Sequence, residues 1–270
     1  MGTEQAAEVL TFDATALARG WLSVALAASK DKARPILYNT IHVEVFGEGV
    51  RLVATDSYIL LRSWVSKLHS DAPEPGLDEA PTVTMIAHDQ YGRGKNLLWH
   101  LLNLSQGEDS PAIELDLTVG DTEPDETQAE PSFDGMAKQW VTFQVPDKER
   151  LKLPTIDGEY PNWRVLDTDF LAVSTKAIGL APEIIKRLAS LEKTAAVTSL
   201  SWVFGGELKA ARVSAVNAFP PVTGLVMPQR IDDWGKEPEA DEVDMHDIAQ
   251  EVVDAVNDGA LGPDVTATLA

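Results

Sequence analysis

The chain has 270 residues, of which 44% are hydrophobic and 24% charged, which is ordinary for a soluble globular protein. It contains no cysteine, which excludes disulfides and thiolate metal sites, and it shows neither a secretory signal pattern nor an apolar run long enough to span a bilayer. The net charge of −21 argues against non-specific adhesion of the whole surface to nucleic acid but permits a local basic lining. We expect a soluble, cytoplasmic protein.

Residues 8–66 predict one β-α-β-β-β unit. Val9–Phe12 reads as a strand, and Asp13 or Thr15 can cap a helix that runs through LARGWLSVALAA. Three strands follow, in TIHVEVFG, VRLVAT and YILLRSWV. The last two flank a polar corner at 55–57, where Thr, Asp and Ser favour a tight turn.

The same order of elements recurs twice. The second unit has strands in PTVTMIA, IELDLTVG, QWVTFQV and ERLKLPTI, a helix in GRGKNLLWHLLNL and an acid-rich insertion at 120–135. The third has a strand in DFLAVS, a helix in PEIIKRLASLEK with Pro182 in its first turn, and strands in TSLSWVFG, LKAARVSAV and TGLVMP. A repeated order of elements indicates a repeat architecture.

Residues 231–270 contain twelve acids and one base. This composition predicts a mostly disordered, solubilising tail. Its segment MHDIAQEVVDAV has apolar residues at helical spacing and is alternatively a docking helix for a partner.

Three segments, in chain order, resemble the bacterial DNA polymerase III β sliding clamp family. LVATDSYIL resembles that family's ATDGHRLA, DGEYPNWRVL resembles DGRFPDYRRVLP, and GLVMPQR resembles YVVMPMR. The resemblance covers residues 8–230 and falls on the second and third domains of the β clamp. It implies an α+β DNA-clamp fold, with helices lining a ring and antiparallel sheets outside.

The resemblance also implies a domain division. Residues 1–166 form a clamp domain of two repeats, 167–230 a partial domain like the C-terminal half of the third clamp domain, and 231–270 the acidic tail. Family rings contain about twelve repeats. A ring therefore needs four such chains, or three if a cryptic fourth repeat exists, and a trimer or tetramer is expected rather than a dimer. A clamp-like monomer stays open as an alternative.

The function implied is that of a processivity factor, in the compact form expected of a phage protein. It would encircle duplex DNA without sequence specificity, tether a replicative polymerase, and depend on a separate ATP-driven clamp loader. The rival hypothesis is a clamp-like decoy or regulator that binds host replication proteins without encircling DNA.

In that family a groove between the second and third domains binds short linear motifs of polymerases, clamp loaders and repair proteins. The matched positions here are Leu22, Thr55, Ser57, Tyr58, Leu60, Pro161, Val165, Leu225, Met227 and Pro228. Each could equally be an ordinary core residue, and the convergence of three segments is what favours a peptide site. Ser57, Tyr58 and Ile59 stand where the family has Gly, His and a basic residue, so partner specificity can differ.

Clamp helices that face DNA need basic residues. The candidates on or beside the predicted helices are Arg19, Lys30, Lys32, Arg34, Arg93, Lys95, Lys186, Arg187 and Lys193. Such contacts reach phosphates and carry no sequence information. The alternative is that these bases are solvated faces of a protein that does not bind DNA.

Catalysis is not indicated. The five histidines show no metal-ligand spacing, no nucleophile elbow is present, and Gly92–Lys95 lacks the spacing of a phosphate-binding loop. We expect a non-catalytic accessory protein without a metal or cofactor.

Overall fold

The computed structural model describes residues 8–31, 33–89, 92–104, 113–121, 136–145, 150–167, 178–206 and 209–229. The chain up to Gln229 forms one compact unit. The predicted acidic tail, the predicted strand DFLAVS and Lys32 lie outside the described residues. The proposed boundary between residues 166 and 167 stays a prediction.

Unit one has the predicted order. Its elements are β1 (Glu8–Asp13), α1 (Ala14–Val24), the 3-10 helix η1 (Ile36–Asn39), β2 (Ile41–Phe46), β3 (Gly49–Thr55) and β4 (Ile59–Ser66). Asp13 caps α1, because its Oδ1 accepts a hydrogen bond from the Ala16 amide at 2.8 Å. The helix ends earlier than predicted, because the amides from Leu26 to Ala28 bond carbonyls three residues back instead of four, and the Ser29 amide donates to the Tyr38 carbonyl (2.6 Å).

Unit two repeats this order and adds a short helix. Its elements are β5 (Val83–Ala87), α2 (Arg93–Leu104), β6 (Glu114–Asp121), β7 (Met136–Gln144), β8 (Leu151–Ile156) and α3 (Arg164–Asp167). Asp89 precedes α2, and its carboxylate accepts hydrogen bonds from the amides of Gly94 (3.2 Å) and Lys95 (2.8 Å) in the first turn. These bonds satisfy amides that a helix start leaves without an intrahelical partner.

Unit three is described from its helix onwards. Its elements are α4 (Pro182–Ala189), α5 (Leu191–Thr194), β9 (Leu200–Phe204), β10 (Ala211–Ala215) and β11 (Val222–Val226). The single helix that was predicted is divided at Ser190, whose amide donates to the Arg187 carbonyl at 3.1 Å. The predicted helix and three strands of this unit are otherwise confirmed.

The eleven strands in the described ranges belong to one antiparallel sheet in the order β1-β6-β7-β8-β5-β2-β3-β4-β11-β10-β9. Units one and two exchange their first strands: β1 pairs with β6, and β5 pairs with β2. Unit three joins through β11, which pairs with β4 from Val222 opposite Ser63 to Val226 opposite Ile59. The α+β clamp architecture expected from the sequence is therefore confirmed.

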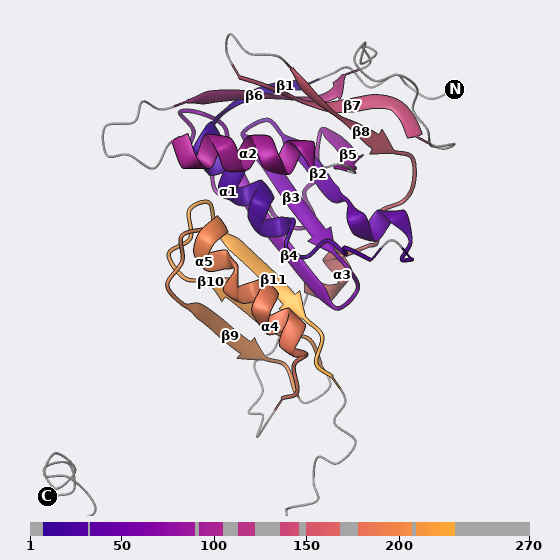
Figure 1. Cartoon of the computed structure of the whole chain (residues 1–270), viewed down its shortest axis with the longest axis vertical. Coiled ribbons are helices and arrows are strands. Elements are labelled where there is room, and N and C mark those ends of the chain that lie inside the picture. Colours follow the sequence, from indigo (N-terminus) through magenta and orange to yellow (C-terminus); the bar gives the residue numbers. More distant parts are fainter. Residues whose placement is uncertain are drawn as a thin grey trace, which may run out of the picture. The chain divides into compact units, whose positions relative to one another are not determined.

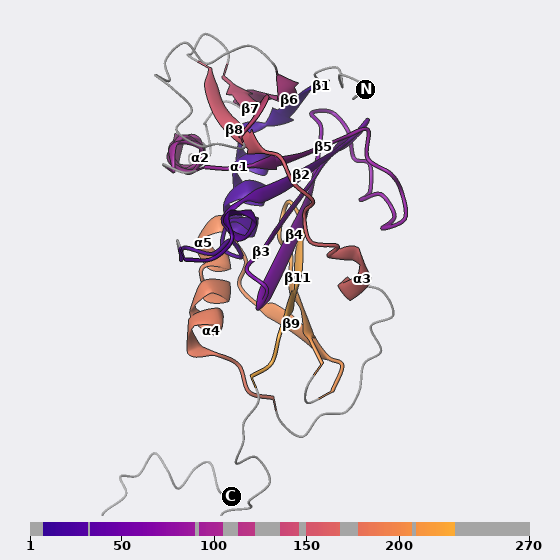
Figure 2. The ribbon, with the colours of Figure 1, turned by 90° about the vertical axis from the view of Figure 1, so that its right-hand side faces the viewer.

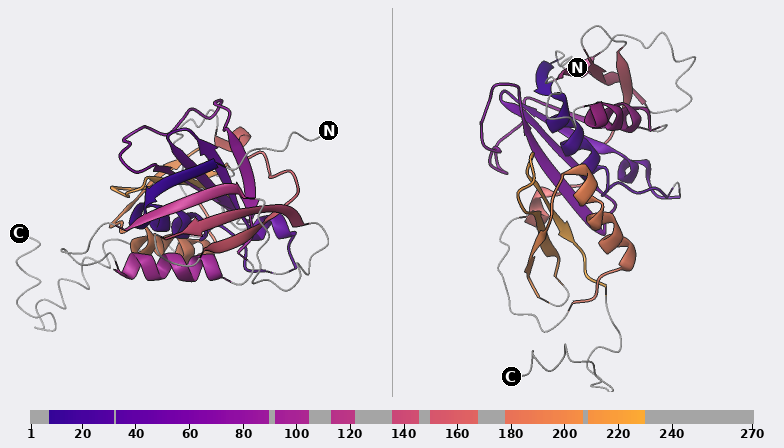
Figure 3. Two further views of the ribbon diagram at one scale, coloured as in Figure 1. Left: turned by 90° about the horizontal axis from the view of Figure 1, so that it is seen from above. Right: turned by 60° about the vertical axis from the view of Figure 1, so that its left-hand side comes forward.

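The helices α2, α1, α5 and α4 lie on one side of the strands, and α3 lies on the other (Figures 1 and 2). The same run of four helices is visible from a further angle in Figure 3 (right). Helix α1 contacts both α2 and α5. Its Trp21 is 1% exposed and packs edge-to-face on Phe143 of β7, with 5.1 Å between ring centroids. The main core is thus shared between units rather than confined to each.

None of the described helices is long and apolar enough to cross a membrane.

Candidate functional site

The corner between β3 and β4 is held by its own side chains. Thr55 Oγ1 donates to the Ile59 carbonyl (2.9 Å) and accepts from the Ser57 amide (3.1 Å). Asp56 Oδ1 accepts from the amides of Tyr58 (2.9 Å) and Ile59 (3.0 Å). Short polar side chains that bind the local backbone in this way favour a sharp corner over a continued ladder.

Ser57 adopts a φ of +77°, a left-handed conformation that favours glycine. A glycine at this position would adopt the same conformation without strain. Ser57 is exposed, and its Oγ accepts a hydrogen bond from Arg34 Nη1 at 3.1 Å.

Replacing Ser57 by Gly is expected to raise the free energy of unfolding by about 0.5–1 kcal/mol, because relief of the left-handed strain exceeds the backbone entropy that glycine loses. Urea denaturation measures the change. Ser214→Gly, within β10, is the matched control and should lower stability. A lower stability for Ser57→Gly would show that the bond from Arg34 outweighs the strain.

Unit three braces the corner through Arg187 of α4. Arg187 Nη1 lies 2.5 Å from Asp56 Oδ2, and the same guanidinium donates to the carbonyls of Leu26 (2.6 Å) and Ala28 (3.3 Å). Arg34 Nη1 donates to the Asp56 carbonyl, and its guanidinium lies 4.8 Å from the centre of the Tyr58 ring. Both arginines were candidates for contact with DNA, and both guanidinium groups bind the corner in this structure.

The three segments that carry the family resemblance meet at this corner. Leu60 of β4 is paired with Leu225 of β11, and the Met227 amide donates to the Tyr58 carbonyl at 2.8 Å. Leu60 and Leu225 belong to a small buried cluster that also contains Trp163 from the DGEYPNW segment. Residues more than 60 positions apart in the sequence are thereby brought into one place.

Four large apolar side chains stay exposed on these segments and the adjoining helix α3, and we call them the corner patch. They are Tyr58 (52% exposed), Val165 (64%), Leu166 (57%) and Met227 (40%). Exposed apolar groups on segments whose buried residues pack together are candidates for an interaction site.

The other predicted pocket residues are buried to different degrees. Leu60 and Leu225 are each 4% exposed and lie beneath the surface, and Thr55 is 7% exposed within the corner. Pro161 and Pro228 are half-buried. Leu22 is 2% exposed in the main core, on α1, rather than in the small cluster with Leu60.

A buried charge network supports the small cluster, and sequence reasoning missed it. Glu44 of β2 is fully buried and lies 3.1 Å from Arg51 Nη1, 2.6 Å from Arg164 Nη2 and 3.0 Å from His42 Nε2. Trp163 Nε1 donates to the same carboxylate at 3.3 Å. Burial alone raises the pKa of Glu44, but the hydrogen bond and charge of His42 and the charges of both arginines outweigh it and lower the pKa to about 2. The carboxylate therefore stays ionised and holds the DGEYPNW segment to the sheet.

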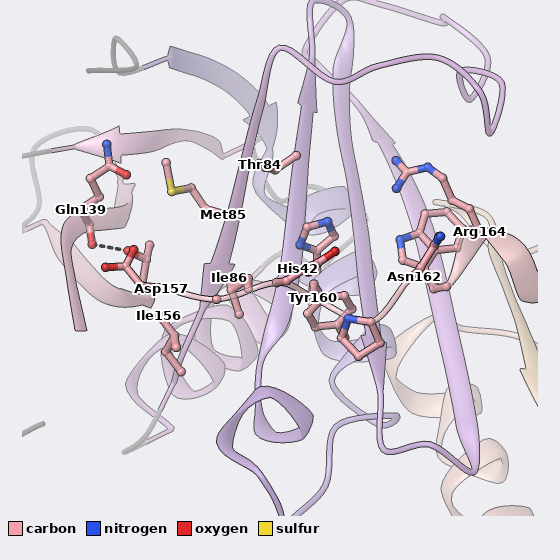
Figure 4. Close-up of a pocket in the computed structure, with 15 residues that line it drawn as sticks. His42, Thr84, Met85, Ile86, Gln139, Ile156, Asp157, Tyr160, Asn162 and Arg164 are labelled. Atoms are coloured by element: carbon pink, nitrogen blue, oxygen red, sulfur yellow. Dashed lines mark hydrogen bonds between the residues drawn. The ribbon is translucent and has the colours of Figure 1, made fainter. Parts of the chain in front are cut away.

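Beside this network lies a cavity of about 440 Å³ between the ends of β5 and β8 (Figure 4). The His42 and Tyr160 rings stack at one side, 4.6 Å apart and within 7° of parallel. Burial raises the pKa of the Tyr160 phenol, so Tyr160 is neutral at physiological pH. Pro161 is the predicted pocket residue that lines this cavity. No trio of His, Asp or Glu side chains in the described ranges is placed to hold a metal ion.

The remaining candidate basic residues lie on or beside the helices that cover one side of the sheet. We call these helices, α1, α2, α4 and α5, the helix layer. Arg93 and Lys95 are exposed in the first turn of α2, Lys186 and Lys193 are exposed on α4 and α5, and Arg19 is half-buried on α1. Lys30 is exposed just beyond α1. Neither α1 nor α2 contains an Asp or Glu, although the chain has 43 such residues. Two helices without acids give this side of the sheet a local basic character within an acidic protein.

Solved structures match this arrangement. A crystal structure of the DNA polymerase sliding clamp from Pseudomonas aeruginosa matches with a TM-score of 0.53 and 13% identity, over 83% of this chain and 67% of the clamp chain. This chain has the sliding-clamp fold. The same organism's DNA polymerase III subunit beta bound to griselimycin matches with a TM-score of 0.52 and 13% identity, over 86% of this chain and 67% of that one.

A third clamp structure, determined with a ligand, has a TM-score of 0.51 and 15% identity, and the match covers 86% of this chain and 68% of that clamp. The chain thus spans about two thirds of the length of these sliding clamps. No protein-family model and no curated protein matches the sequence. At this identity the likeness establishes the fold.

Proposed function

We propose that this chain is a DNA polymerase processivity factor. Several copies assemble into a ring that encircles duplex DNA without reading its sequence, and the corner patch tethers a replicative polymerase through a short linear motif. A separate ATP-driven loader opens the ring. The protein itself has no catalytic role, and it acts in the cytoplasm of a bacterium or of a phage-infected cell.

The observation that carries this proposal is the meeting of three distant segments at the corner of a sliding-clamp fold. Tyr58 and Met227 are joined through their backbones, and Leu60, Leu225 and Trp163 pack beneath them. A partly exposed apolar patch over a rigid floor, with a flexible Met at its edge, suits one or two apolar side chains of a peptide. Raising the local concentration of a tethered enzyme requires only such a modest contact.

The helix layer supports the DNA-binding part of the proposal. Helices α1 and α2 present Arg19, Arg93 and Lys95 without any carboxylate of their own. None of these three basic side chains has a hydrogen bond or ion pair within the described part of the chain, so they are available to phosphates. Contacts of this kind hold a duplex without fixing its register, which is what sliding requires.

Primer extension tests the function directly. On a primed circular single-stranded template, the protein with polymerase and loader is expected to lengthen the product of each binding event. On a short linear template, from which a ring slides off, the gain should be small. Shorter products in the presence of the protein would contradict the proposal and indicate a decoy that sequesters the polymerase.

Reversing two charges on α2 tests the basic layer. Arg93→Glu combined with Lys95→Glu is expected to weaken duplex binding at low salt by about tenfold and to shorten extension products, because phosphate contacts are lost. The matched control is the double variant Lys67→Glu with Lys209→Glu. It makes the same change in net charge, but in turns that follow strands. Equal losses in both variants would show that net charge, and not the helix layer, governs binding.

A further inference from the structure

The cavity of about 440 Å³ beside the Glu44 network is not needed for the proposed function. His42 of β2 and Ile86 of β5, which are paired, line it, and so does Arg164 at the start of α3. The cavity is therefore on the side of the sheet that carries α3, away from the helix layer (Figures 2 and 4). Each of its lining residues belongs to the described part of the chain. Its volume is within the range of small-ligand sites.

His42 gives the wall of this cavity a hydrogen-bond acceptor. Its Nε2 lies 3.0 Å from Glu44 Oε1. Because the Glu44 carboxylate stays ionised, it can only accept, so the proton of the neutral imidazole is on Nε2. Nδ1 then carries a lone pair. This atom is buried and meets no hydrogen-bond partner in the described part of the chain, an arrangement that costs free energy until a donor arrives.

Tyr160 forms the adjoining part of the wall. Its ring stacks on His42, nearly parallel to the imidazole (Figure 4). The residue is 8% exposed, and among the described residues its hydroxyl likewise has no partner in hydrogen-bond geometry. A phenol accepts a hydrogen bond as readily as it donates one. The wall therefore combines a flat aromatic surface with two buried polar atoms that can accept.

The mouth of the cavity is acidic. Asp157 and Glu159 line it and are exposed, and neither carboxylate has an ion pair or a hydrogen bond within the described ranges. The lining contains one arginine and no lysine, and the Nη2 atom of that arginine, Arg164, lies 2.6 Å from a carboxylate oxygen of Glu44. The positive charge of Arg164 is thus already compensated, whereas the two negative charges at the mouth are not.

We propose that this cavity binds an organic cation, a guanidinium or ammonium group of the kind that ends an arginine or lysine side chain. Such a group carries only donors, which match Nδ1 of His42 and the Tyr160 hydroxyl. Its charge is attracted by Asp157 and Glu159 and by the aromatic wall. An anion would meet two uncompensated carboxylates, and an apolar group would leave the buried acceptors without donors. The site goes beyond the processivity function, because neither DNA nor the polymerase motif at the corner patch occupies it.

Isothermal titration calorimetry of the full-length protein tests the ligand class. The probes are agmatine, a free guanidinium compound, and the blocked peptide acetyl-Gly-Arg-Gly-amide. The same peptide with citrulline in place of arginine keeps nearly the same shape without the charge, and it is expected to bind at least about tenfold more weakly. Tighter binding of the arginine peptide than of agmatine identifies a side chain of a protein partner as the source, and equal binding identifies a free small cation. Binding of neither cation at millimolar concentration, or equal binding of the citrulline peptide, would overturn the proposal.

Neutralising the mouth separates this site from the general attraction of an acidic protein for cations. Asp157→Asn combined with Glu159→Gln is expected to weaken binding of the arginine peptide by about tenfold. Glu183→Gln combined with Glu192→Gln makes the same change in net charge on α4 and α5, in the helix layer, and should leave binding unchanged. Equal losses in the two double variants would refute the site.

Nitrogen NMR of the histidine side chains observes the acceptor directly. On saturation with agmatine, the Nδ1 resonance of His42 is expected to move towards lower frequency, because its lone pair accepts a hydrogen bond. An unmoved His42 resonance at saturation would contradict the proposal. Cation binding by a protein that gives no gain in primer extension would refute the processivity function and leave this site standing.

Discussion

Replacing Glu44 by Gln lowers the free energy of unfolding by about 3–5 kcal/mol, because breaking a buried ion pair leaves charges without compensation. Arg51 is itself fully buried and would keep Glu74 Oε1 at 2.8 Å as its remaining carboxylate partner. Arg164 and the Trp163 indole would lose the carboxylate that holds their segment to β2. Urea denaturation followed by tryptophan fluorescence measures the loss.

Glu48→Gln is the matched control. Glu48 follows the same strand, is exposed, and pairs with Lys67 at 2.9 Å on the surface. Exposed pairs contribute little, so this variant should unfold at nearly the same urea concentration as the unaltered protein. Equal effects at Glu44 and Glu48 would contradict a structural role for the buried network.

The dependence of stability on pH provides a second measure of how much the Glu44 network stabilises the protein. The pKa of Glu44 is about 2 in the folded protein and 4.5 as a free side chain, so its contribution to stability is complete above about pH 4.5 and is lost as the pH falls towards 2. This single group should remove about 3 kcal/mol of stability across that interval. Glu44→Gln should show a correspondingly shallower decline, and identical slopes for both proteins would refute the assignment.

Met227→Asp is expected to weaken peptide binding by about tenfold to a hundredfold without unfolding the protein. Met227 is 40% exposed, so a carboxylate there costs little in the free protein. In the complex that carboxylate would be desolvated against an apolar side chain of the peptide. Fluorescence anisotropy with a labelled peptide that carries a polymerase's clamp-binding motif measures the change.

Phe219→Asp is the control for this substitution. Phe219 is 69% exposed and lies on the β10–β11 connection rather than on a corner-patch segment. The same apolar-to-acidic change should leave peptide binding intact there. Binding that survives Met227→Asp, in a protein that unfolds at its normal temperature, would dismiss the corner patch as the tethering site.

Local chemistry explains why much of the candidate site could be predicted. The corner is made by side chains that bind backbone groups two to four residues away, as Thr55 and Asp56 do. The cap of α1 is equally local, since Asp13 bonds the amide of Ala16. Interactions over such short separations leave a recognisable pattern of residue types in the sequence.

The ion pairs that hold the site together leave no such pattern in the sequence. Glu44 is one acid among 43, and its role depends on Arg164, which lies 120 residues away. Arg187 was predicted to face DNA, yet it binds Asp56 from a separation of 131 residues. Which basic residue meets which acid follows from how the units dock, and a charge alone does not encode that choice.

The sequence by itself determined the order of elements in the three units, the corner at Thr55–Ser57 and the three segments expected to meet there, because helix caps, strand alternation and turn residues act within a few positions. Only the tertiary structure decided that units one and two exchange strands and that β11 joins β4. Strand pairing is specified by backbone groups that every residue carries, so its partners are settled by packing across the whole molecule.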